Sequence, residues 1–98
     1  MIKEFGNRIA ADLFHSGKTK KLPVEFWQRA IYLSDIMDAV SSLDELQGKG
    51  FPPSLRLHKL KGARKNEFAI VINKVSGWRI TFEFSENDFY NLKIEDYH

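Results

Sequence analysis

The stretch that decides the fold is residues 78–84, Trp78-Arg79-Ile80-Thr81-Phe82-Glu83-Phe84, in which large apolar and polar side chains alternate strictly. A period of two is typical of a β-strand that buries one side and exposes the other. The aromatic and aliphatic side chains are expected on the buried side, and those of Arg79, Thr81 and Glu83 on the opposite side. This stretch therefore favours a sheet whose aromatic face lies under another layer.

Three further stretches have strand-like patterns. Residues 55–58 alternate, and residues 68–72 are apolar throughout. In the last run, the alternation predicts that Tyr90 shares one side of its strand with Leu92 and Ile94. Turn-forming residues separate the runs at 61–64, 74–77 and 85–88. Short strands joined by tight connections predict an antiparallel meander.

The first half of the chain supplies the covering layer. Over residues 23–40 apolar positions recur every three or four residues, which predicts an amphipathic helix. Residues 1–5 favour a short extended segment, and residues 42–45 favour a capped single turn. Residues 8–14 form only a brief apolar group, and a basic loop follows at residues 16–21. The prediction is one α+β domain over residues 1–98, in which an N-terminal strand and helices pack on a curved antiparallel sheet.

Composition excludes several classes of protein. The chain has 98 residues, a formal net charge of +2 and no Cys, which excludes a disulfide scaffold, a thiol nucleophile and every Cys-based zinc site. Its three His residues lack metal-ligand spacing, so we expect no metal and no cofactor. No apolar run approaches the roughly 18 residues of a membrane span, and we expect a cytoplasmic protein without membrane contact.

Charge is unevenly distributed along the chain. Residues 56–79 hold seven basic groups and one acidic group, for +6, whereas residues 80–98 hold one basic and five acidic groups, for −4. This local concentration predicts a site for a polyanion. The alternative is ordinary surface charge solvated by water.

The predicted sheet gathers candidate residues on its polar side. Arg79 points away from the aromatic side, and His58 lies opposite Leu57 in the first run, with Lys61 and Arg64 in the loop after it. An anion-binding face is one interpretation of this arrangement. A solvent-facing sheet surface with a few charges is the other.

The last residues, Asp96, Tyr97 and His98, directly continue the final alternating run. His58 and His98 are suitable as an acid–base pair in RNA hydrolysis, where one group takes the 2′-OH proton and another protonates the departing 5′-oxygen. Asp96 is able to orient a histidine or act as the base, and Tyr97 to donate a proton or stack on a nucleotide base. Arg79 and Lys61 would stabilise the charge that develops on phosphate.

Several of these stretches together resemble the HigB family of toxins, in the RelE/ParE superfamily of toxin–antitoxin systems. The resemblance rests on Leu57-His58-Lys59-Leu60-Lys61-Gly62, on residues 78–84 and on the terminal Asp96-Tyr97-His98, and it extends to residues 2–5, 21–23 and 42–46. It spans nearly the whole chain in the right order. It implies a RelE-like, microbial-ribonuclease-like fold, in agreement with the order of helices and strands above.

The resemblance also implies a function. Such a toxin is a ribosome-dependent endoribonuclease that cuts mRNA at codons in the ribosomal A site. A cognate helix-turn-helix antitoxin of the HigA type would inhibit it, and the toxin would reach operator DNA only indirectly, through that antitoxin.

Site residues follow from the same resemblance. His58 and Asp96 become the leading proton-transfer pair, with His98 as alternative or helper and Tyr97 as a stacking or positioning group. The basic residues expected to contact RNA are Lys61, Arg64 and Arg79, together with Lys20 and Lys21, for which ribosomal RNA is the expected partner. Two alternatives remain open, a gyrase-binding toxin of the ParE type and a nucleic-acid or protein interaction module that cuts nothing.

Overall fold

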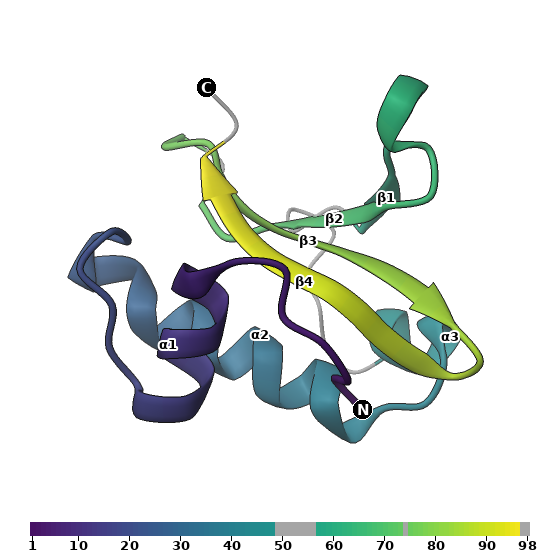
Figure 1. Ribbon diagram of the computed structural model, residues 1–98, viewed down its shortest axis with the longest axis horizontal. Coiled ribbons are helices and arrows are strands. Elements are labelled where there is room, and N and C mark those ends of the chain that lie inside the picture. The colour runs from purple at the N-terminus through teal and green to yellow at the C-terminus, as the bar shows by residue number, and fades with distance from the viewer. Residues whose placement is uncertain (49–56, 74, 97–98) are drawn as a thin grey trace.

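The computed structural model describes residues 1–48, 57–73 and 75–96, and it has the predicted α+β architecture (Figure 1). The elements in chain order are α1 (Arg8–Ser16), η1 (Val24–Phe26), α2 (Trp27–Ala39), α3 (Leu43–Gly48), β1 (His58–Lys59), η3 (Gly62–Arg64), β2 (Phe68–Val71), β3 (Trp78–Ser85) and β4 (Asp88–Asp96). Leu55 and Arg56, from the first predicted strand, lie outside the described residues, as do Tyr97 and His98. No helix in the described ranges is long and apolar enough to cross a membrane.

The sheet is the predicted antiparallel meander, with strand order β1-β2-β3-β4. Strands β3 and β4 form its longest hairpin. Their connection is the two-residue turn Glu86–Asn87, and both residues have positive φ, at 50° and 71°. Two-residue turns with positive φ at both positions match the right-handed twist of the strands that they join. Each of the two strands is therefore one residue longer at the turn than predicted, since the turn was expected at residues 85–88.

A bulge corrects the prediction for Tyr90. Thr81 pairs with Lys93 but Glu83 pairs with Tyr90, so β4 contains one more residue than β3 between these two pairs. Asn91 lies in this interval with φ of 52°. The extra residue reverses the alternation. Tyr90 therefore pairs with Glu83 and shares its side of the sheet, whereas the buried Leu92 lies on the other side. Simple period-two counting contains no sign of such an insertion.

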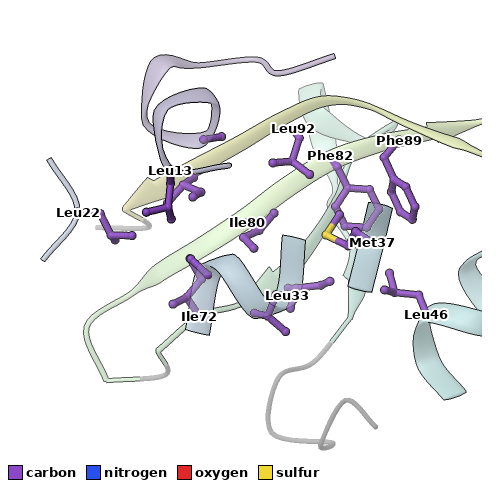
Figure 2. Packing of buried hydrophobic residues seen from close by; sticks show 14 of the residues in the cluster. Leu13, Leu22, Leu33, Met37, Leu46, Ile72, Ile80, Phe82, Phe89 and Leu92 are labelled. Carbon is purple, nitrogen blue, oxygen red and sulfur yellow. The ribbon is translucent and has the colours of Figure 1, made fainter. Parts of the chain in front are cut away.

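The predicted aromatic side of β3 lies in the core. Ile80 and Phe82 are fully buried, and they face α1 and α2, which cover this side of the sheet (Figure 1). Figure 2 shows side chains from both layers meeting here, including Leu33 and Met37 of α2. Hydrophobic burial between the two layers is the main force that holds them together.

Helix α1 was not predicted as a helix. The sequence there contains only a brief apolar group, yet nine residues are helical. Asn7 caps the first turn by accepting a hydrogen bond from the backbone N–H of Ala10, and Gly17 ends the helix in the left-handed conformation with φ of 76°. These two residues are ordinary start and stop signals for a helix. Helix α2 begins after the single turn η1 instead of at Pro23, and Ser42 caps α3 as predicted, since its Oγ accepts from the Glu45 backbone N–H at 3.0 Å.

The N-terminal segment lies along the outer edge of β4. Ile2 bridges to Phe89 and Phe5 bridges to Leu92, both in parallel orientation. The Gly6 N–H then donates to the Leu92 carbonyl at 2.7 Å, and a Cβ on Gly6 would clash with the side chain of Asn91. The extended segment predicted for residues 1–5 thus pairs with the edge of the sheet.

Asn7 joins α1 to β4, and its removal is expected to weaken the fold. Its Oδ1 accepts from the N–H groups of Ala10 at 3.1 Å and Ile94 at 3.3 Å, and its Nδ2 donates to the Ile94 carbonyl at 2.9 Å. Asn7→Ala should lower the free energy of unfolding by roughly 2 kcal/mol, because a helix cap is lost and two strand groups lose their partner. Urea denaturation measures the change. Asn66→Ala, at an exposed turn, is the matched control and should change stability by less than about 0.5 kcal/mol; equal effects of the two substitutions would contradict this role of Asn7.

Candidate functional site

The side of the sheet opposite α1 and α2, here called the open face, carries the predicted cationic residues. His58 pairs with Ala69, Ala69 with Thr81, and Thr81 with Lys93. Residues paired across antiparallel strands point to the same side, and Arg79 lies two positions before Thr81 on β3. His58 and Arg79 therefore share one face, as the sequence indicated.

Arg64 reaches over this face from η3. Its Nε and Nη2 atoms donate to the two carboxylate oxygens of Glu67, each at 2.8 Å. Its Nη1 donates to Glu95 Oε1 at 2.6 Å, and Nη2 also lies 3.3 Å from Thr81 Oγ1. The bidentate pair with Glu67 is the geometry that a planar guanidinium favours most. All three nitrogens of the Arg64 guanidinium are thus hydrogen-bonded within the protein.

Two further cations join the same cluster. Arg79 Nη2 lies 3.2 Å from Glu95 Oε1, the oxygen that Arg64 also contacts, and Lys93 Nζ lies 3.2 Å from Glu67 Oε1. The Arg79 side chain is only 13% exposed. We call this group the salt-bridge cluster: Arg64, Glu67, Arg79, Lys93 and Glu95. Three cations and two carboxylates leave it with a formal charge of +1.

The cluster perturbs the protonation of its carboxylates. Hydrogen bonds from Arg64, assisted by Lys93, lower the pKa of Glu67 to about 2, against the opposing effect of burial. The two carboxylates Glu67 and Glu95 raise the pKa of Arg64. Both shifts favour the charged forms, as expected for opposite charges in direct contact.

His58 and Lys61 lie at the edge of the sheet. His58 is exposed on β1, and Lys61 is exposed between β1 and η3. In Figure 1 this corner rises above the sheet, on the side away from α1 and α2. An imidazole and an ammonium group therefore stand on the accessible border of the open face.

Asp96 lies on β4, at the opposite edge of the described sheet from His58. It is exposed at the end of β4 and pairs with Trp78, so its position in the alternation corresponds to the helix-covered side of the sheet. Strand β4 is three strand spacings from β1, or about 14 Å. The described strands therefore do not bring His58 and Asp96 together. Tyr97 and His98 lie outside the described residues.

Lys20 and Lys21 are remote from the open face. Both line a groove of about 920 Å³ in the helical layer, between α1 and the start of α2, with Leu22, Pro23 and Trp27. They are exposed there, which fits a contact with a large partner but not a place beside His58.

The acidic half of the salt-bridge cluster was not predicted from the sequence. Along the chain, Glu67 is the single acidic residue of a basic segment and Glu95 belongs to an acidic one. The available signal was the alternation itself, because Glu95 falls on the same side of β4 as Lys93. Pairing β4 with β3 in the correct register places Glu95 directly opposite Arg79.

The fold and this face define a class of protein. Helices on one side of a four-stranded antiparallel sheet, with basic residues on the other, agree with the RelE-like toxins. Residues 3–98 match the family model described as the RelE-like toxin of the type II toxin–antitoxin system HigB. The chain is also 34% identical over 98 residues, covering 100% of both sequences, to the protein named Endoribonuclease HigB from Proteus vulgaris. The chain belongs to the HigB family of type II toxins, and membership of such a system implies an antitoxin partner.

Acid should weaken the fold through Glu67. Because its folded-state pKa lies below the ordinary value of 4.5, the ionised carboxylate stabilises the fold at neutral pH, and this contribution is lost as the pH falls from about 5 towards 2. Glu67→Gln should therefore reduce the free energy of unfolding by about 2 kcal/mol at pH 7 and by much less near pH 2. Denaturant titrations at several pH values measure the difference. Glu86→Gln, in the exposed β3–β4 turn, should show no such trend; a pH-independent difference for Glu67→Gln would refute the assignment.

Proposed function

We propose that this toxin is an endoribonuclease that requires the ribosome and cuts mRNA at codons in the A site. The observation that carries the proposal is the full-length similarity to a protein named an endoribonuclease. The open face supports it, because the salt-bridge cluster keeps a formal charge of +1 and the exposed Lys61 lies at its border, which suits a polyanionic substrate. The relevant compartment is the cytoplasm, where ribosomes and mRNA are found.

The proposed chemistry is transfer of the phosphodiester to the neighbouring 2′-oxygen. A base removes the proton from the 2′-OH, the oxygen attacks phosphorus, and an acid protonates the departing 5′-oxygen. We assign the proton transfers to His58 and Asp96, with His98 as alternative or helper. Tyr97 stacks on a base or positions the phosphate, and Arg79 and Lys61 stabilise the negative charge on the phosphate oxygens.

His58 and Asp96 belong to strands at opposite edges of the sheet, and Asp96 falls on its helix-covered side. A general base and a general acid must both come within hydrogen-bond reach of the same phosphodiester. Joint action of His58 and Asp96 therefore requires the two edges to approach each other around the bound RNA, which a substrate held in one conformation by the ribosome would favour.

The remaining contacts concern large partners. Lys20 and Lys21 contact ribosomal RNA in this proposal, from the helical layer. The antitoxin partner is a helix-turn-helix protein, through which the toxin would associate with operator DNA.

Cleavage of mRNA on programmed ribosomes tests the activity. Wild-type protein should cut translated mRNA with codon phasing and cut naked RNA far more slowly. His58→Ala and Asp96→Asn should each lower the rate by about 100-fold, within the range for loss of a general acid or base. The matched controls are His15→Ala on α1 and Asp35→Asn on α2, both exposed and in the helical layer, which should retain activity.

Mapping of mRNA 5′ ends after brief induction distinguishes the alternatives. Codon-phased cuts are expected. DNA damage without such cuts would instead support a gyrase-binding toxin. If neither codon-phased cuts nor DNA damage is observed, the protein is a binding module without catalysis. Full cleavage by both His58→Ala and Asp96→Asn would overturn the residue assignment while leaving the activity in place.

A further inference from the structure

The edge of the sheet that carries His58 has little backbone support in the described residues. Strand β1 contains two residues, and its register consists of two pairs, His58 with Ala69 and Lys59 with Phe68. Beyond these, the N–H of Leu60 donates to the Glu67 carbonyl at 2.8 Å. A ladder this short leaves the edge able to open locally at low cost.

Arg64 supplies a second attachment for this edge. It stands in η3, in the connection between β1 and β2, and its guanidinium reaches Thr81 on β3 and Glu95 on β4. The contact with Glu95 joins residues 31 positions apart in the chain. Glu67, at the end of the same connection, holds the guanidinium in place through two hydrogen bonds.

We propose that Arg64 is a positioning residue that clamps the β1–β2 connection, with His58 and Lys61, to β4 through the shared carboxylate of Glu95. This inference rests on the proposed function for its catalytic consequence. It changes the role of Arg64 from the RNA contact expected on the basis of the resemblance to a structural one.

The hydrogen bonds of Arg64 favour a clamp over an RNA contact. A phosphate would have to displace Glu67 or Glu95 from the guanidinium, and Glu67 is a bidentate partner whose side chain is only 12% exposed. Lys61 has no such carboxylate partner among the described salt bridges and is exposed at the border of the open face. The two basic residues of this connection therefore divide the work, with Arg64 holding the edge and Lys61 facing substrate.

Arg64→Lys separates the two roles, because it keeps the charge and loses the planar fork. A clamp predicts that Arg64→Lys and Arg64→Gln behave alike. In both, amide hydrogen exchange at Leu60 and Glu67 should become about tenfold faster, the change expected from loss of one charged hydrogen bond. On programmed ribosomes kcat should fall about tenfold with KM nearly unchanged, because His58 is displaced while the charge for RNA binding is retained or only slightly altered.

One further variant and two matched controls complete the test. Glu95→Gln should speed exchange at Leu60 although it lies on β4, whereas Glu86→Gln in the β3–β4 turn should not. Lys65→Gln removes a positive charge next to Arg64 from an exposed side chain and should leave exchange at Leu60 unchanged.

The opposite pattern would overturn the clamp. If Arg64→Lys retains wild-type cleavage, Arg64→Gln raises KM, and neither changes exchange at Leu60, then Arg64 contacts RNA. Absence of cleavage by the wild-type protein would refute the proposed function only, because the exchange measurements test the clamp without any RNA.

Discussion

The pairing of β3 with β4 is the constraint on which the rest of the structure depends. The hairpin has two sides and two edges, and each is used. Its apolar side receives α1 and α2, its polar side carries the salt-bridge cluster, its β3 edge pairs with β2, and its β4 edge pairs with the N-terminal segment. A change in the register of this one pairing would exchange the contents of the two sides.

The fold could be predicted from sequence to the extent that it follows side-chain periodicity. Strict alternation around Ile80 identified β3 and its buried side, and the three- to four-residue spacing through Leu33 identified α2. Two features escaped because they depend on single residues. The bulge near Asn91 reverses the alternation without any apolar signal, and α1 is defined more by its cap at Asn7 than by its short apolar stripe.

The candidate site was predictable in its cations but not in their partners. A count along the chain separates a basic segment from an acidic one, yet folding places Glu95 of the acidic segment directly on Arg64 and Arg79 of the basic one. The net charge that folding gathers around Arg64 and Arg79 is therefore much smaller than the net charge of the basic segment in the sequence. The exposed His58 and Lys61 retain their predicted access, whereas Arg64 is bound within the protein. Which cations face a ligand depends on strand register, and composition does not contain that information.

The parallel bridges of the N-terminal segment have a consequence for synthesis. Ile2 and Phe5 are made early, but their partners Phe89 and Leu92 belong to β4, the last strand in chain order. The edge contact, the docking of α1 through Asn7, and the carboxylate of Glu95 all wait for that strand to leave the ribosome. A nascent chain that has not yet released β4 therefore lacks the edge contact, the attachment of α1 to the sheet and the carboxylate of Glu95. The order of the strands delays assembly of the open face until all four described strands have left the ribosome.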